Sequence, residues 1–229
     1  VMLQKGENEF LFRVGRGRLT ASLHEAQPRL AFMGDDDTTP DLIVGAPVDA
    51  LVGVQIGNFT TEWLNNATIL ATGPGGEEQP SFLGAIPPMS VRKIPVRLSA
   101  LSPEASGEMT FTLAIIDPGV EAPIDERTMT LAIVEPEATR RVTFQSDIDG
   151  SVQFYGLTPA VVDPQARMWP GIILTLHGAG VDAKRQAACY QPKDFAHVVA
   201  PTNRRPFGFD WEDWGRLDAL EALEHAQRT

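Results

Sequence analysis

A short apolar run in the second half of the sequence ends at a turn made of small residues. The run Gly171–Leu176 is followed directly by His177, Gly178, Ala179 and Gly180. An apolar run of this length, bounded by turn residues, is typical of a strand that is buried on both faces, as parallel sheets require. Because the turn carries little side chain, its backbone can approach a ligand closely. The backbone N–H groups of Gly178 and Ala179 are therefore candidate donors to an anion.

A group of polar side chains follows a second apolar run. Asn203, Arg204 and Arg205 come shortly after Ala196–Ala200. Open α/β sheets place their ligands at the carboxyl ends of strands, and an arginine there can bind a substrate carboxylate through two hydrogen bonds, or a carbonyl. The alternative is that the arginines pair with nearby acidic side chains and stiffen the loop. The acidic candidates are Asp210, Glu212 and Asp213.

Six elements are expected to position these residues, in the order β-β-β-α-β-α. Asp182 is an acceptable N-cap for the first helix, and the second helix is amphipathic, with apolar residues at helical spacing. In chain order we expect strands at Arg141–Ser146, Ser151–Leu157 and Gly171–Leu176, a helix at Asp182–Cys189, a strand at Ala196–Ala200 and a helix at Trp211–Gln227.

The first half of the chain shows strand and turn patterns with no helical stretch between them. Glycine (20) and proline (18) are abundant, which favours turns and short strands. We expect a hairpin of Phe10–Val14 and Arg18–Leu23 around Gly15–Gly17, and strands at Leu30–Met33, Asp41–Val44, Val48–Phe59, Ala67–Thr72, Val91–Leu98, Met109–Ile116 and Thr128–Val134. This spacing indicates an antiparallel, Ig-like β-sandwich. With a boundary at Glu135–Thr139, the chain divides into residues 1–139 and 140–229.

Composition and charge exclude several classes of function. The 229 residues carry a formal net charge of −11, which argues against nonspecific nucleic-acid binding because that requires a basic surface. No stretch approaches the ~20 apolar residues of a membrane helix, so no membrane partner is expected. A single cysteine, Cys189, excludes an internal disulfide.

Other chemistry-bearing residues favour structural interpretations. Asp35–Asp37 lacks the regular spacing of a calcium loop and is interpreted as a solvated turn rather than a metal site. Trp63 is expected to fill the sandwich core rather than to bind a ligand. Cys189 is expected to be a buried small hydrophobe, and His197 a hydrogen-bonded residue of the sheet. No metal or cofactor is predicted.

Three segments together resemble the prolyl-oligopeptidase-type serine hydrolases of bacteria. The segments are Asp149–Tyr155, the His-Gly-Ala-Gly turn ending at Gly180, and Ala200–Asp218 with its Asn-Arg-Arg and Asp-Trp pairs. The resemblance covers roughly residues 140–229, and it gains weight from the strand order. The first half is similar only in general character to the accessory sandwich domains of some of these enzymes.

The resemblance implies an α/β-hydrolase that acts on a peptide or ester through a serine, a histidine and an acidic residue. The turn after the third strand then supplies an oxyanion-hole N–H from Gly178 or Ala179, with His177 and Gly180 supporting the turn. The resemblance also suggests an exported bacterial protein.

The catalytic triad that the resemblance implies is expected beyond Thr229, the last residue of the sequence. The pentapeptide Gly-x-Ser-x-Gly, which holds the nucleophile in this fold, does not occur in the sequence. The acidic residue and the histidine follow the nucleophile in the chain order of this fold. We therefore expect the chain to be the N-terminal part of such a hydrolase, ending before the nucleophile elbow, with no catalytic residue of its own and no activity alone.

Two other interpretations remain. The chain could belong to a non-catalytic binding or scaffold protein with a degenerate hydrolase domain. Alternatively, the first half could be a carbohydrate- or protein-binding module, although it offers Trp63 and scattered phenylalanines rather than a row of aromatics.

Overall fold

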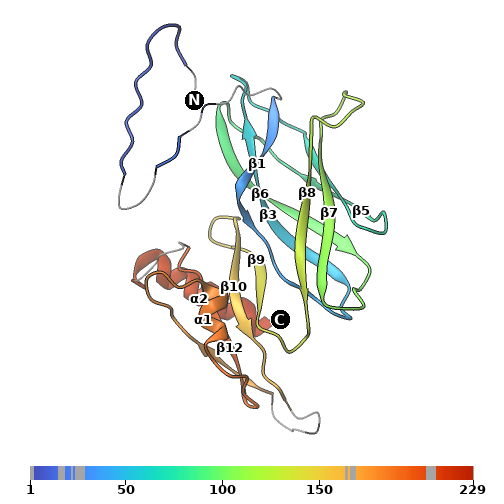
Figure 1. The fold of residues 1–229 in the computed structure, drawn as a ribbon, viewed down its shortest axis with the longest axis vertical. Coiled ribbons are helices and arrows are strands. Elements are labelled where there is room, and N and C mark those ends of the chain that lie inside the picture. Colours follow the sequence, from blue (N-terminus) through green and yellow to red (C-terminus); the bar gives the residue numbers. More distant parts are fainter. Residues whose placement is uncertain are drawn as a thin grey trace.

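The computed structural model describes residues 3–14, 19–21, 23, 29–162, 165, 169–204 and 210–228. Over these residues the chain is mostly β, with three sheets and two short helices (Figure 1). Two of the sheets are formed by the first half of the chain, and the third sheet and both helices by the second half.

The first two sheets come from residues 30–134. The three-stranded sheet has the antiparallel order β1 (Leu30–Thr38), β3 (Val48–Asn58), β6 (Ser90–Ala100). The five-stranded sheet has the order β2 (Leu42–Ile43), β8 (Asp125–Val134), β7 (Gly107–Ile116), β4 (Thr68–Thr72), β5 (Glu78–Phe82). All pairs in the second sheet are antiparallel except β2 with β8.

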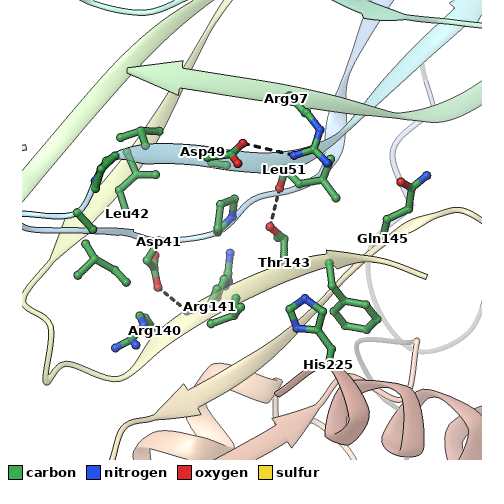
Figure 2. A pocket seen from close by; sticks show the side chains of 18 residues that line it. Asp41, Leu42, Asp49, Leu51, Arg97, Arg140, Arg141, Thr143, Gln145 and His225 are labelled. Atoms are coloured by element: carbon green, nitrogen blue, oxygen red, sulfur yellow. Dashed lines mark hydrogen bonds and ion pairs between the residues drawn. The ribbon is translucent and has the colours of Figure 1, made fainter. Parts of the chain in front are cut away.

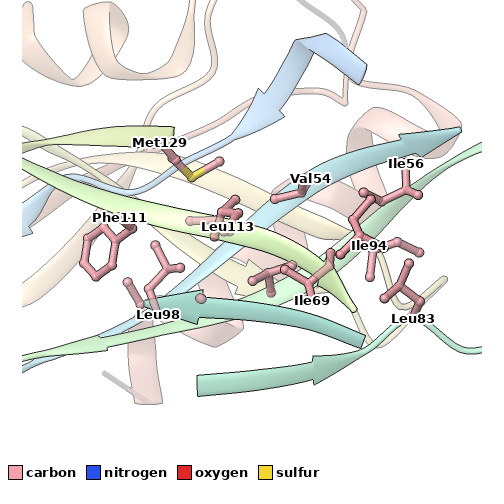
Figure 3. Packing of buried hydrophobic residues seen from close by; sticks show 14 of the residues in the cluster. Val54, Ile56, Ile69, Leu83, Ile94, Leu98, Phe111, Leu113 and Met129 are labelled. Atoms are coloured by element: carbon pink, nitrogen blue, oxygen red, sulfur yellow. The ribbon is translucent and has the colours of Figure 1, made fainter. Parts of the chain in front are cut away.

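One apolar core lies between these two sheets (Figure 3). Successive side chains of a strand point to opposite faces, and β7 therefore buries Phe111, Leu113 and Ile115 while Thr110 and Thr112 face away from the core. From the other sheet, Val54 and its neighbours on β3 close the core. Each fully buried side chain of this size stabilises the fold by about 1.5–3 kcal/mol.

Polar contacts join the two sheets along their edges. The backbone N–H of Phe32 on β1 donates to Asp125 of β8 at 2.8 Å. On the opposite side, the N–H of Arg97 on β6 donates to Ser81 of β5 at 3.1 Å. The two sheets, together called the half-barrel below, are therefore tied to each other on both sides of their common core.

The third sheet has the order β11-β12-β10-β9. Its strands are β9 (Arg140–Gln145), β10 (Val152–Thr158), β11 (Gly171–Leu174) and β12 (Ala196–Pro201). The pairs β9–β10 and β10–β12 are antiparallel, and β11–β12 is parallel. With α1 (Ala183–Ala188) and α2 (Asp213–Arg228), the element order is the expected β-β-β-α-β-α.

The two helices lie on opposite faces of this sheet. Tyr155 of β10 packs in one apolar cluster with Ala222 of α2. A Cβ on the next residue, Gly156, would overlap the carbonyl oxygen of Ala183 in α1. Neighbouring residues of a strand face opposite sides, so α1 covers one face and α2 the other.

The half-barrel and the third sheet are joined by polar contacts along β9. The N–H of Asp41 donates to the carbonyl of Arg141 at 3.1 Å, and the N–H of Arg141 donates to the Asp41 carboxylate at 2.7 Å. Lys184 of α1 forms an ion pair with the same carboxylate at 2.6 Å. The expected boundary, Glu135–Thr139, falls in the short connection between β8 and β9.

The predicted N-terminal hairpin is wrong. Phe10–Val14 forms no strand, nor do the described residues of Arg18–Leu23, and Gly15–Gly17 lies outside the described residues. The segment is rich in β-prone residues, but a strand requires a partner and a face to bury. Here Leu11 is 90% exposed.

The acidic run Asp35–Asp37 is not a turn. It continues β1 through an irregular stretch between Met33 and Thr38. Asp36 pairs with Lys93 at 3.1 Å, and Asp37 pairs with Arg127 at 2.8 Å. Cations of neighbouring strands compensate the carboxylates, which allows a polar run to continue a strand.

Two predictions of burial are also wrong. Trp63 is 59% exposed and lies outside the core, in the irregular segment between β3 and β4. Cys189 is exposed, and its thiol donates to the carbonyl of Arg185. Both positions follow the end of a regular element, where local sequence does not determine which face is covered.

Candidate functional site

The glycine-flanked turn lies at the carboxyl end of β11, as the sequence predicts. The ladder between β11 and β12 continues one residue past β11, because the N–H of Thr175 donates to the carbonyl of Val199 at 2.9 Å. The chain then leaves the sheet at Leu176 and enters the turn.

The turn spans Gly178 to Val181. The N–H of Val181 donates to the carbonyl of Gly178 at 3.3 Å, and Gly180 has a φ of +81°. A glycine with positive φ at the third position is typical of a type II turn, in which the second position, here Ala179, also accepts proline.

Two amides of the turn have no hydrogen-bond acceptor among the described residues. Over the described part of the chain, no hydrogen bond uses the N–H of Gly178 or of Ala179, and both residues are exposed. A Cβ built on Gly178 would meet no atom within 4 Å. Two adjacent amides of exposed residues are therefore without an acceptor among the described residues, and Gly178 has no side chain to obstruct a small anion there.

His177 supports this turn from inside. It is 3% exposed, and its ring nitrogens lie 3.0 Å from the carbonyl of Gly178 and 3.2 Å from that of Thr202. The indole N–H of Trp211 donates to the carbonyl of His177 at 3.0 Å. The ring therefore connects the turn after β11 to the loop after β12.

Asn203 is a buried connector rather than an exposed polar group. It has a φ of +60° and is 1% exposed. Its backbone N–H donates to Asp218 at 2.8 Å, and its side-chain amide donates to the carbonyl of Asp210 at 2.5 Å. These contacts hold the loop after β12 against the start of α2.

Arg204 is held by carboxylates of the protein itself. Its guanidinium bonds to Asp149 at 2.7 Å and Glu221 at 2.9 Å, and its Nε lies 3.6 Å from Asp218. The same group donates to the hydroxyl of Ser146 at 2.7 Å. Only 12% of its side chain is exposed. Internal pairing was one of the two alternatives, but the partners differ from the three acidic residues expected.

The acidic partners were missed because they are distant in sequence or lie inside a helix. Asp218 and Glu221 are three residues apart on α2, which places them on neighbouring positions of one helix face. The sequence did contain a signal for this pairing, because an acidic pair at that spacing lies on the helix that follows the Asn-Arg-Arg loop.

Two residues named in the predictions of the site lie outside the described residues. One is Arg205, the second arginine of the polar loop. The other is Thr229, which follows the last residue of α2 and beyond which the catalytic triad is expected. The structure therefore leaves both the role of Arg205 and the position of the triad as predictions.

The pKa values of two carboxyl groups beside Arg204, those of Asp218 and Asp149, are shifted in opposite directions. Burial raises the pKa of Asp218, which is fully buried, and the nearby Arg204 only partly opposes this. At Asp149, burial acts in the same raising direction, but hydrogen bonds from Ser151 and the charge of Arg204 outweigh it and lower the pKa. Of these two carboxyl groups around Arg204, Asp218 therefore holds its proton more tightly than an ordinary aspartate, and Asp149 holds it less tightly.

His197 and His225, the other two histidines that the structure describes, have structural contacts. Nδ1 of His197 accepts the N–H of Ala160 at 3.1 Å, as expected for a hydrogen-bonded sheet residue, and burial lowers its pKa. His225 lies 3.2 Å from the hydroxyl of Tyr155 and stacks on Phe144.

A cavity of about 440 Å³ lies beside the loop after β12, which contacts the turn after β11 through His177. Thr202 and Arg204 line it from the loop after β12 and Asp182 from the start of α1, and Asp36 and Lys93 line it from the half-barrel. Because Thr202 also contacts His177, this cavity adjoins the residues that support the turn.

Within the described residues, no group of three or more His, Cys, Asp or Glu side chains could hold a metal ion. No helix among them is both long and apolar enough to cross a bilayer. Comparison of the sequence with protein-family models and with curated proteins finds no match.

Proposed function

We propose that this chain is part of a serine hydrolase, a peptidase or esterase, in which residues 177–180 supply the oxyanion-hole turn. The observation that carries the proposal is a pair of amides, those of Gly178 and Ala179, which follow the carboxyl end of a parallel strand and have no acceptor within the described part of the chain. Such donors stabilise the charge that develops on the substrate oxygen in the transition state.

The strand order supports the finer assignment, which is the first part of an α/β-hydrolase sheet following an Ig-like sandwich. An antiparallel hairpin at one edge is followed by two parallel strands joined through a helix, in the spatial order β9-β10-β12-β11. The helices lie on both faces, as α/β sheets require. The proposed turn follows the third strand in chain order, where this fold places one of its oxyanion donors.

The nucleophile, the acidic residue and the catalytic histidine are proposed to come from residues beyond Thr229. Ser146 is 2% exposed and bonded to Glu221, so its hydroxyl is not available to a substrate. We therefore expect this chain alone to hydrolyse p-nitrophenyl esters no faster than background. Turnover that disappears after treatment with a serine-directed fluorophosphonate would contradict this proposal.

The donor role is tested in the longer hydrolase that this proposal requires. Ala179→Pro removes one N–H, and proline suits the second position of a type II turn, so the turn should persist. We expect kcat to fall by about 10²–10³-fold, the usual effect of losing one oxyanion donor. Ala179→Ser keeps the N–H and is the matched control, for which kcat should change little. Equal kcat values for the two variants would contradict the role of Ala179.

The alternative is a non-catalytic binding or scaffold protein. The observation that favours it is the outer side of α2, where Trp214 and Leu220 are 54% and 45% exposed. A residue other than Ser, Cys or Asp at the nucleophile position of the longer protein would support this alternative.

A further inference from the structure

A second cavity, of about 360 Å³, lies between the half-barrel and the third sheet (Figure 2). The half-barrel wall comes from residues 40–51 and from Arg97 of β6, and the other wall comes from β9 with His225 of α2. The hydroxyl of Thr143 donates to the carbonyl of Leu51 at 2.6 Å and joins the two walls. This cavity shares no lining residue with the one beside the proposed oxyanion turn.

More basic than acidic residues line this cavity. Two acidic residues, Asp41 and Asp49, and three arginines, Arg97, Arg140 and Arg141, are among its lining residues. Asp41 is already bound by Lys184, which lies outside the lining, at 2.6 Å, and Asp49 pairs with Arg97 at 3.3 Å. Over the described residues, no ion pair joins Arg140 or Arg141 to a carboxylate. An excess of positive charge therefore occurs locally, in a chain whose net charge is −11.

Both arginines of β9 have polar atoms without a partner. The Nε atoms of Arg140 and Arg141 are buried, and neither forms a hydrogen bond within the described part of the chain. Arg140 donates instead to the carbonyl of Pro136 at 2.7 Å. Arg141 lies over the ring of Phe154, with its guanidinium carbon 5.2 Å from the ring centroid. Burial lowers the pKa of Arg140, although the nearby Tyr155, Asp41 and Glu137 oppose the shift.

Apolar side chains form the rest of the lining. Leu42, Pro47 and Val142 contribute to it. A ligand that complements this cavity therefore needs an anionic group for the arginines and an apolar body for the remaining wall. Arginine binds carboxylates through two parallel, charge-assisted hydrogen bonds.

We propose that the cavity between β3 and β9 binds a small organic carboxylate, held by Arg141 of β9, with its apolar body against Leu42 and Pro47 of the half-barrel wall. The site is independent of the proposed hydrolase turn, so either proposal can fail alone. The ligand would also bridge the half-barrel and the third sheet, because its two parts contact different walls.

The test is isothermal titration calorimetry of the whole chain with three probes: hexanoate, hexanamide and inorganic phosphate. We expect saturable binding of hexanoate, with hexanamide at least about tenfold weaker because it lacks the charge. Phosphate should bind more weakly than hexanoate because it lacks the apolar body. The proposal is overturned if hexanoate shows no saturation, if hexanamide binds as well as hexanoate, or if phosphate binds more tightly.

Substitutions of single arginines test whether hexanoate binds in this cavity. Arg141→Gln should weaken hexanoate binding by about tenfold or more. Arg141→Lys keeps the positive charge but cannot donate two parallel hydrogen bonds, and it should have a smaller effect. Arg216→Gln removes the same charge from an exposed position of α2 that does not line the cavity and is the matched control. Circular dichroism and the urea midpoint establish that each variant is folded. Equal affinities of folded Arg141→Gln and Arg216→Gln would overturn the proposal.

Discussion

The indole N–H of Trp211 donates to the backbone carbonyl of His177 at 3.0 Å, and the two rings meet edge to face with centroids 5.1 Å apart. This contact joins the segment that leads into α2 to the turn that follows β11. Asn203, bonded to Asp218 of α2, holds the loop after β12 to the same helix. One helix thus positions both segments in which the sequence places candidate site residues.

Replacing Trp211 should loosen this connection. Trp211→Phe keeps an aromatic ring but removes the N–H, leaving the carbonyl of His177 without this donor. We expect the free energy of unfolding to fall by about 1 kcal/mol, measured by urea denaturation. Trp169→Phe is the control, because Trp169 is 95% exposed and its replacement should be neutral. Equal stabilities of the two variants would show that the hydrogen bond is not formed.

Gly215 is required by the close approach of Asn203. A Cβ at Gly215 would overlap Oδ1 of Asn203 and lie 3.0 Å from the carbonyl of Asp210. Asn203 cannot move freely, because its own amide is bonded to Asp210. Gly215→Ala should therefore destabilise the protein by about 1–3 kcal/mol. Gly34→Ala, where a Cβ would meet no atom within 4 Å, should be nearly neutral in the same urea titration.

Stability should fall as the pH decreases below the ordinary histidine pKa of 6.5. Burial lowers the pKa of His197, aided by the charge of Arg140. Burial also lowers the pKa of His225, with Glu221 opposing the shift. In this range the unfolded chain binds protons that the folded chain does not, so protonation favours unfolding. Urea unfolding between about pH 7 and pH 5 measures the slope.

The contribution of His197 can be isolated. His197→Gln should reduce the loss of stability over that pH range, because one of the two histidines responsible is removed. Asp218 acts with the opposite sign. Its pKa is raised above 3.8, so its contribution to stability decreases as the pH rises through that value. An unchanged slope in His197→Gln would contradict the role of His197.

The outer side of α2 should promote self-association. Trp214, Leu217 and Leu220 are 54%, 36% and 45% exposed, whereas Ala219 and Ala222 face the sheet. We expect light scattering to give a mass above the 24.9 kDa of one chain, and Leu220→Glu to lower it. Leu101→Glu, at a position 76% exposed elsewhere, should leave the association unchanged. A monodisperse monomer would contradict this prediction.

The sequence by itself determined most of the regular elements. Alternating residues predict a strand at Val91–Leu98, and the structure has β6 at Ser90–Ala100. The short helix begins one residue after its expected N-cap, Asp182, whose carboxylate accepts the N–H of Arg185. These features depend on periodicity and capping, which operate over a few residues and are therefore readable locally.

Strands without such a pattern were not predicted. β5 (Glu78–Phe82) contains charged and polar residues and a proline, and it exists because β4 pairs with it. The reverse occurs at Phe10–Val14, which has β-prone residues but forms no strand. Pairing with a distant segment, rather than propensity, decides such cases.

Only the tertiary structure decided which side chains are exposed and which charges meet. The His-Gly-Ala-Gly turn was visible in the sequence, but whether the amides of Gly178 and Ala179 find an acceptor among the described residues depends on what surrounds them. Arg204 is bonded by Asp149 from a hairpin 55 residues away, and Arg141 meets a cavity formed with the half-barrel. Burial and long-range ion pairing arise from segments brought together by the fold, so their physical cause lies outside any local stretch of sequence.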